Sequence, residues 1–271
     1  MSGAQTRAEV VDLLARYDVS PRRPLGQHFL GDPNIVRKIV QAAELDPESR
    51  VLEIGAGTGT LTAELATAGH HVLSYEIDGG LAPLLSEVCG EVAGIDLRFQ
   101  DAMSVDFLKE MQGGPWALVA NLPYNIGTPL LLRIMREVPT VTRFVVMIQR
   151  EVVDRLVAEP GSKTYGVPSI VAGLHTRKID WFGVPRQVFV PPPNVDSAVA
   201  ILERIEAPEG AEMAIRLAKA AFGQRRKMLR SSLKAILEDP LPALDVADIE
   251  PTARAETVSP AEFLALANAI R

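Results

Sequence analysis

The stretch Val51-Leu52-Glu53-Ile54-Gly55-Ala56-Gly57-Thr58-Gly59-Thr60 decides the fold of this chain of 271 residues. Its first four residues are apolar apart from one acid and are followed by glycine, a pattern typical of a short buried strand. Three glycines at every second position then favour a turn that most side chains could not adopt. Helical spacing follows over 60–68. A strand, a glycine turn and a helix in this order predict the start of a nucleotide-binding α/β unit.

The spacing of these glycines weakens a dinucleotide interpretation, because that fingerprint needs its third glycine one position later. A second predicted strand, 71–75, ends in Glu76. This acid lies about twenty residues past the turn, where a ribose-binding carboxylate is expected, although a solvated strand end would also carry an acid. The pattern Glu-x-Gly-x-Gly-x-Gly resembles motif I of the S-adenosylmethionine-dependent methyltransferases.

Composition sets the limits within which a function can be sought. The chain is long enough for one large domain and one small one. A single cysteine, Cys89, excludes internal disulfides and cysteine-cluster metal sites, and the four histidines show no ligand spacing. Because the chain has no run of 18 apolar residues and no apolar signal core at its N-terminus, we expect a cytoplasmic protein without membrane spans. We also expect a monomer that holds no metal.

The order of predicted elements indicates a doubly wound, mainly parallel α/β sheet. Strands are expected at 50–54, 71–75, 96–100, 116–120 and 143–149, and they alternate with helices at 33–44, 79–89, 128–137 and 150–158. Ligands of such sheets bind at the carboxyl ends of the strands. Four polar or glycine positions fall at these ends and predict one shared site: Gly55, Glu76, Asp101 and Asn121.

For the residues before and after this predicted sheet, helices are predicted from the spacing of apolar residues and loops from proline and glycine. A helix is expected within residues 1–20, followed by an irregular loop over 21–30 with two prolines and a glycine. Beyond residue 160, strands are expected at 179–184 and 195–202, and then helices at 209–222, at 225–237 and after Ser259. We place a boundary near residue 205, between a methyltransferase domain (1–205) and a helical RNA-binding domain (206–271).

The tetrapeptide Asn121-Leu122-Pro123-Tyr124 carries the most specific chemistry. It resembles the Asn/Asp-x-Pro-Tyr/Phe motif of adenine-N6 and related methyltransferases. An exocyclic amine is a poor nucleophile because its lone pair is delocalised into the ring. An Asn carbonyl and the backbone carbonyl before proline can accept hydrogen bonds from this amine and aim it at a methyl donor, while Tyr124 can stack on the base. A base within RNA structure must first be extruded to reach such a pocket.

Together these motifs resemble the small-subunit ribosomal RNA adenine dimethyltransferases, the kasugamycin-sensitivity methyltransferase family, over roughly residues 20–235. Three further segments match the family: 26–30 (Gly-Gln-His-Phe-Leu), 189–197 (Phe-x-Pro-x-Pro-x-Val-Asp-Ser) and 222–227 (Phe-x-x-Arg-Arg-Lys). The family usually has Asn at the position of His28. The resemblance implies that two adjacent adenosines near the 3′ end of small-subunit rRNA are each methylated twice at N6.

The resemblance also assigns roles to residues. It implies catalytic roles for Asn121, Leu122, Pro123, Tyr124 and Phe189, with Phe189 stacking near the target base. It implies that Asp101 accepts a hydrogen bond from the cofactor adenine, although an Asp at this position could equally cap a helix. The S-adenosylmethionine site is then expected to comprise Gln27, His28, Leu30, Gly55, Gly57, Glu76, Ile77, Asp101, Ala102 and Asn121.

The charge distribution points to an RNA partner although the net charge is −6. Between 216 and 234 there are seven basic residues and no acid. An acidic protein with one basic face can still bind phosphate. We expect RNA contacts from Arg225, Arg226, Lys227 and Arg230.

Two other functions fit parts of the sequence. One is a macrolide-resistance type of enzyme, which dimethylates an adenine of large-subunit rRNA with the same catalytic motif. The Val-Asp-Ser triplet and the Arg-Arg-Lys signature favour the small-subunit enzyme instead. The other is a ribosome-assembly factor that keeps the fold without catalysis, against which the intact Glu76, Asp101, Asn121 and Tyr124 argue.

Overall fold

The structure is a computed structural model that describes residues 4–270. The chain divides into two compact units. The first takes in the chain up to Val153 together with Lys178–Arg204, and the second takes in Asp154–Arg177 together with the chain from Ile205 onward. No helix among the described residues is both long and apolar enough to cross a membrane.

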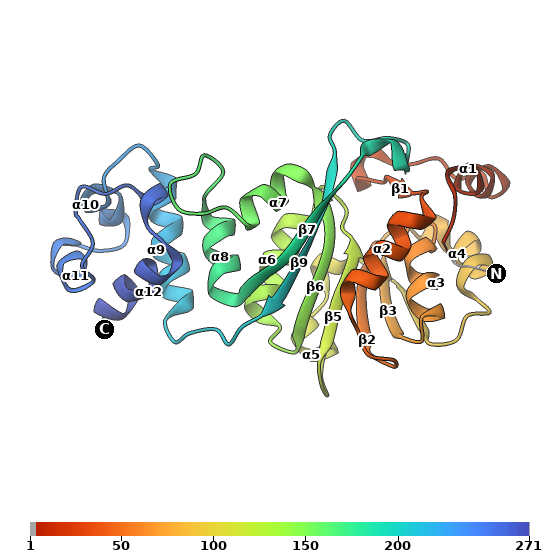
Figure 1. Ribbon diagram of the computed structural model, residues 1–271, viewed down its shortest axis with the longest axis horizontal. Helices are drawn as coiled ribbons and strands as arrows, with labels where there is room; N and C mark the ends of the chain where they lie inside the picture. Colours follow the sequence, from red (N-terminus) through yellow and green to blue (C-terminus); the bar gives the residue numbers. More distant parts are fainter. Residues whose placement is uncertain (1–3, 271) are drawn as a thin grey trace. The chain divides into compact units, whose positions relative to one another are not determined.

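A seven-stranded sheet forms the centre of the first unit (Figure 1). Its order is β4-β3-β2-β5-β6-β9-β7, in which β2 to β6 run parallel and β9 is antiparallel to β6. The order reverses between β2 and β5, and ligands of open α/β sheets bind at such switch points. The strands are β2 (Arg50–Ile54), β3 (His71–Glu76), β4 (Ile95–Phe99), β5 (Trp116–Asn121), β6 (Val141–Gln149), β7 (Thr176–Val184) and β9 (Ser197–Arg204). The predicted α/β class is therefore confirmed.

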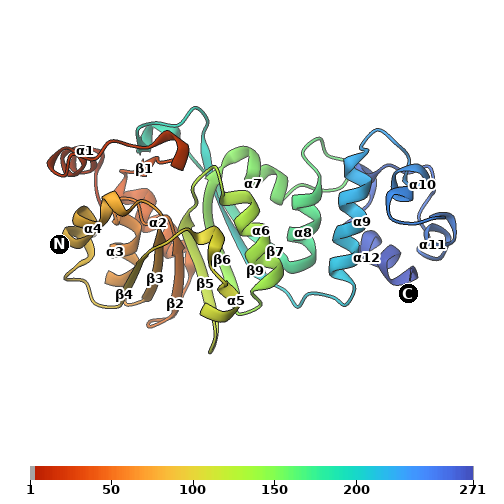
Figure 2. The same ribbon diagram turned by 180° about the vertical axis from the view of Figure 1, so that it is seen from behind.

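Helices cover both faces of this sheet. Figure 1 shows α2 (Pro33–Ala43) and α3 (Thr60–Thr67) on one face, and Figure 2 shows α5 (Phe107–Glu110) and α6 (Gly127–Glu137) on the other. A short 3₁₀ helix, η2 (Gly79–Leu81), leads into α4 (Ala82–Cys89), which packs against α3. Another, η3 (Ala102–Ser104), follows β4, and α7 (Arg150–Leu156) follows β6. The central strands β2, β3, β5 and β6 are buried on both faces of the sheet, which explains the nearly continuous apolar runs in their sequences.

The N-terminal part of the chain is more regular than expected. Helix α1 (Arg7–Arg16) begins with a capping box between Thr6 and Glu9. The segment 21–30, predicted to be an irregular loop, contains a 3₁₀ helix, η1 (Arg23–Leu25), and a short strand, β1 (Phe29–Leu30). After η4 (Arg186–Val188), β8 (Phe189–Val190) pairs with β1 in an antiparallel ribbon. This pairing joins residues about 160 positions apart, so local sequence could not indicate it.

The second unit is helical. It contains α8 (Val167–His175), α9 (Ala211–Gly223), α10 (Leu229–Ser232), η5 (Leu233–Ala235), α11 (Leu241–Val246), η6 (Ala255–Thr257) and α12 (Pro260–Ala269). Sequence reasoning missed α8 and was wrong about a continuous helix over 225–237. A turn over 224–227 separates α9 from α10, because Gln224 and Lys227 close a turn after Gly223 ends the helix.

Candidate functional site

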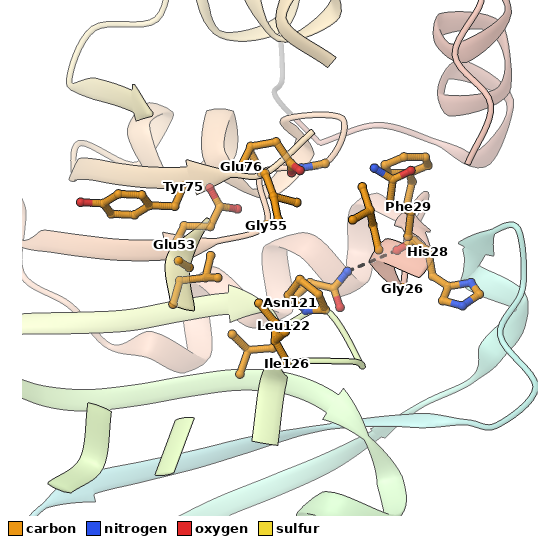
Figure 3. A pocket seen from close by; sticks show the side chains of 18 of the residues that line it. Gly26, His28, Phe29, Glu53, Gly55, Tyr75, Glu76, Asn121, Leu122 and Ile126 are labelled. Atoms are coloured by element: carbon orange, nitrogen blue, oxygen red, sulfur yellow. Dashed lines mark hydrogen bonds between the residues drawn. The ribbon is translucent and has the colours of Figure 1, made fainter. Parts of the chain in front are cut away.

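A cavity opens at the carboxyl ends of β2, β3, β4 and β5, where the sheet order reverses (Figure 3). Its empty space, open solvent included, is about 840 Å³. All ten residues predicted to bind the cofactor line it, as do Leu122, Pro123 and Tyr124. The structure therefore brings together every predicted site residue of the first unit except Phe189.

Glu76 holds the glycine turn at one side of the cavity. Its side chain is buried, and one carboxylate oxygen accepts a hydrogen bond from the Gly57 backbone N–H at 2.9 Å. The other oxygen accepts one from the Asp78 backbone N–H at 2.9 Å. Burial raises the pKa of Glu76, and these two backbone donors oppose that shift. A carboxylate held in this way presents its remaining lone pairs to a ligand in a fixed direction.

The glycine turn owes its close approach to the absence of side chains. Gly57 has φ of +58°, and a Cβ there would lie 3.2 Å from the ring of Phe29. Gly55 has φ of +86°, and a Cβ there would lie 3.2 Å from the ring of Pro123. Both backbone conformations favour glycine over residues with a side chain. The turn thus packs directly against β1 and against the tetrapeptide Asn121–Tyr124.

Glu53 is a second buried acid behind the turn, and its surroundings were not predicted. It is fully buried on β2 and accepts hydrogen bonds from the hydroxyls of Thr62 at 2.6 Å and Ser74 at 2.8 Å. Burial, aided by the charge of nearby Glu76, raises the pKa of Glu53 to about 7, although the two hydroxyl donors oppose this. The acid in motif I is therefore a titratable group of the cavity wall.

Asp101 lines the cavity and also caps a helix. Its Oδ1 accepts a hydrogen bond from the Met103 backbone N–H at 2.8 Å, which begins η3. The capping interpretation is thus confirmed. The capping hydrogen bond uses one carboxylate oxygen of Asp101, which lies at the edge of the cavity. This bond fixes the orientation in which the Asp101 side chain faces a ligand.

Asn121 ends β5 with its amide oriented by the N-terminal segment. Its Nδ2 donates a hydrogen bond to the His28 carbonyl at 3.4 Å, drawn as a dashed line in Figure 3. Its Oδ1 thereby remains the acceptor end of the amide. The hydroxyl of Tyr124 forms a short hydrogen bond with that of Ser197, and its ring lies 5.5 Å from the His28 ring, centroid to centroid. The His28 Nδ1 in turn contacts the Pro191 carbonyl at 2.8 Å.

Phe189 departs from its predicted place. Its side chain is fully buried and packs in the core beside Leu30, its partner in the β1–β8 ribbon, and it does not line the cavity. Stacking on a target base requires an accessible ring face. The placement therefore corrects the expected stacking role and makes Phe189 a packing residue.

The basic residues predicted to contact RNA differ in whether their side chains bond to other residues of the protein. The Arg225 guanidinium donates to Glu256 at 3.1 Å and to the backbone carbonyls of Lys163 and Tyr165. Arg226, Lys227 and Arg230 are exposed and form no ion pair with the described residues. Consecutive basic residues in the sequence could not show this difference. Of the four predicted RNA contacts, Arg225 is thus committed to holding its own unit together.

Ser197 and Asp78 are two further residues near the site whose contacts the sequence did not indicate. Ser197 belongs to the quoted Val-Asp-Ser triplet, but only the structure pairs it with Tyr124. Asp78 follows Glu76 by two residues, and its buried position gave no sequence signal. No cluster of three or more His, Cys, Asp or Glu side chains that could hold a metal occurs among residues 4–270.

Comparison with known proteins places the chain in a family. Residues 19–271 match the family described as ribosomal RNA adenine dimethylase. The chain is 41% identical over 268 residues to ribosomal RNA small subunit methyltransferase A of Phenylobacterium zucineum, covering 98% of this chain and 93% of that protein. It is 40% identical to the protein of the same name from Lactococcus lactis, covering 96% and 93%.

Solved structures show the same architecture. A dimethyladenosine transferase from Plasmodium falciparum superposes with a TM-score of 0.72 at 26% identity, covering 88% of this chain and 96% of that one. The 23S rRNA methyltransferase ErmE superposes with a TM-score of 0.67 at 27% identity, covering 89% and 98%. On these matches, which extend over nearly the whole chain, the protein belongs to the ribosomal RNA adenine dimethylase family.

Proposed function

We propose that the protein, acting as a monomer, transfers methyl groups from S-adenosylmethionine to N6 of two adjacent adenosines near the 3′ end of small-subunit rRNA. The observation that carries this proposal is the meeting of Glu76 and Asp101 with the Asn121–Tyr124 tetrapeptide in one cavity. The names of the Phenylobacterium and Lactococcus relatives favour the small subunit over the large one.

The residues of the cavity fit a nucleoside cofactor. Glu76 is a buried carboxylate held by two backbone donors, suited to accept from ribose hydroxyls. Asp101 offers an acceptor for an adenine amine, and exposed Ile77 offers an apolar surface beside it. Gly55 and Gly57 allow the ligand to approach the backbone. When bound, S-adenosylmethionine supplies an electrophilic methyl group on a sulfonium centre.

The catalytic step needs an oriented amine rather than a general base. The Asn121 Oδ1 accepts one N–H of the adenine amine because its Nδ2 is already used by the His28 carbonyl. In the first methyl transfer the backbone carbonyl of Leu122, fixed by Pro123, accepts the other N–H, whereas the monomethylated amine of the second transfer keeps a single N–H for one of the two acceptors. These two bonds turn the nitrogen lone pair out of conjugation with the ring. Such contacts strengthen as the amine becomes tetrahedral, so they act chiefly on the transition state.

Tyr124 supplies the surface against which the target base stacks. Its hydroxyl bond to Ser197 and the neighbouring His28 ring limit how the phenol can turn. Stacking on one aromatic ring contributes about 1–3 kcal/mol per base, which offsets part of the cost of extruding the adenosine. Arg226, Lys227 and Arg230 of the helical domain, which we place at 206–271, bind the RNA backbone.

A product analysis tests this function. We would incubate the protein with labelled S-adenosylmethionine and undermethylated small or large ribosomal subunits, digest the rRNA and weigh the nucleosides. We expect N6,N6-dimethyladenosine from the small subunit only. Product from the large subunit would support the macrolide-resistance type of activity. Tight binding to small subunits without any methylated product would support a non-catalytic assembly factor.

A further inference from the structure

We propose that Asp78, which does not line the cavity, positions the segment Arg22–Leu30 over it and so sets the affinity for the nucleoside cofactor. We call Arg22–Leu30 the strap. The inference rests on the proposed function, because it assumes that the cavity binds S-adenosylmethionine. It concerns a positioning residue, which acts on the ligand through the strap and through Glu76.

Asp78 is a buried carboxylate that holds two parts of the strap at once. Only 3% of its surface is exposed. Its Oδ1 pairs with the Arg22 guanidinium at 3.0 Å and also accepts from the Gly80 backbone N–H at 3.0 Å. Its Oδ2 accepts a hydrogen bond from the Gln27 side-chain amide at 2.9 Å. A buried charge is stable only with such a full set of partners, so strap and carboxylate depend on each other.

The same residue is tied to the cofactor side of the cavity. The Asp78 backbone N–H donates to Glu76 Oε1 at 2.9 Å. Asp78 thus contacts the acceptor proposed for the ribose through its backbone and the strap through its side chain. Movement of the strap and reorientation of Glu76 are thereby linked through one residue.

Gln27, which was predicted to bind the cofactor, also has a structural role in the strap. Its Nε2 donates to Asp78, and its Oε1 accepts from the Arg22 backbone N–H at 2.7 Å. Both polar ends of its amide are therefore engaged within the protein. Gln27 lines the cavity, and these two bonds make it the connector between the rest of the strap and Asp78.

The far end of the strap is held separately. The His28 carbonyl accepts from Asn121, and Phe29 pairs with Val190 in the β1–β8 ribbon. Loss of the Asp78 contacts should therefore release the strap near Arg22 and Gln27 while its β1 end stays in place. Cofactor binding should suffer more than the orientation of Asn121, which depends on the β1 end.

The test combines cofactor binding with hydrogen exchange. We would measure the dissociation constant of S-adenosylmethionine by calorimetry and backbone exchange over 22–30 for Asp78→Asn, Arg22→Ala and Arg22→Lys. Asp78→Asn should weaken binding about tenfold and speed exchange at 22–27, since it removes the charge from three hydrogen bonds. Arg22→Ala should weaken binding about threefold, and Arg22→Lys should restore most of it. Turnover at saturating cofactor should stay within about threefold of wild type.

Two variants serve as matched controls. Asp106→Asn removes another Asp that caps a short helix, through the Lys109 backbone N–H at 3.2 Å, and Arg16→Ala breaks the exposed Arg16–Glu87 ion pair. Neither residue lines the cavity, so both should bind the cofactor like wild type.

Wild-type affinity and exchange in Asp78→Asn would overturn the inference, and so would a lower unfolding temperature with unchanged affinity. If Asp78→Asn does not fold, the exposed Arg22→Ala variant decides by the same criteria. Wild-type protein that binds no S-adenosylmethionine would refute the proposed function instead. The exchange rates over 22–27 would then still decide whether Asp78 holds the strap.

Discussion

Glu76 and Asn121 lie on opposite sides of the cavity, and on the proposed function their substitution should separate binding from catalysis (Figure 3). Glu76→Gln keeps the size of the side chain but removes the charge and one acceptor. We expect weaker S-adenosylmethionine binding by about 1.5–3 kcal/mol, the contribution of a hydrogen bond to a charged group. Calorimetry on the folded variant measures this. Unchanged cofactor affinity would remove Glu76 from the cofactor site.

Asn121→Ala should lower turnover about 10²–10³-fold, because the lost acceptor acts mainly in the transition state. Cofactor affinity should change by no more than a few fold. Asn121→Asp is a second comparison: it retains an acceptor oxygen, but it replaces the donor to the His28 carbonyl with a negatively charged oxygen. Single-turnover formation of methylated adenosine distinguishes the two. Near-normal turnover in Asn121→Ala would contradict the proposed orientation of the amine.

At the scale of elements, the turn between α9 and α10 holds Arg225 in contacts within the second unit and leaves Arg226 and Lys227 exposed. Each phosphate contact contributes about 0.7–0.9 to the slope of log affinity against log salt concentration. Arg226→Ala combined with Lys227→Ala should therefore lower that slope by up to about 1.5 in small-subunit binding. A salt series of subunit binding gives the slope directly.

Arg225→Ala is the control for this measurement. Because Arg225 is bonded to Glu256 and to two backbone carbonyls, its loss should lower the thermal stability of the second unit and leave the salt slope unchanged. A slope that falls for Arg225→Ala but not for the double variant would reverse our assignment of the two groups.

At the scale of the whole molecule, Glu53 should make stability depend on pH. Its pKa is raised from 4.5 to about 7 in the folded protein, so the native state binds an extra proton between these values. Stability from this group is full below about pH 4.5 and is lost as pH rises towards 7. The wild type should lose on the order of 2–3 kcal/mol of unfolding free energy over that interval because of Glu53, and Glu53→Gln should not show this loss.

Urea unfolding of wild type and Glu53→Gln, without cofactor, at several pH values between 4.5 and 7.5 checks this expectation. As pH rises from 4.5 to 7.5, the unfolding free energy of Glu53→Gln should increase relative to that of the wild type. A constant difference across the interval would show that Glu53 stays ionised throughout. Titrating groups far from Glu53 are common to both proteins and cancel in the comparison, whereas the titration of nearby Glu76 is coupled to that of Glu53 and does not cancel.

The sequence by itself determined the sheet, the glycine turn and the positions that meet at the cavity. Predicted strands ending at Gly55, Glu76, Asp101 and Asn121 were sufficient because parallel strands align their carboxyl ends at one edge. Local periodicity determines such features, since each strand and helix is encoded by neighbouring residues.

Only the tertiary structure decided which of these residues are free to act. The β1–β8 ribbon buries Phe189, ion pairing engages Arg225, and Asp78 lies beneath the strap. Each of these contacts joins segments far apart in the chain. Side-chain type and spacing carry no information about partners that come close only when the whole chain has folded, so burial and pairing had to be read from the structure.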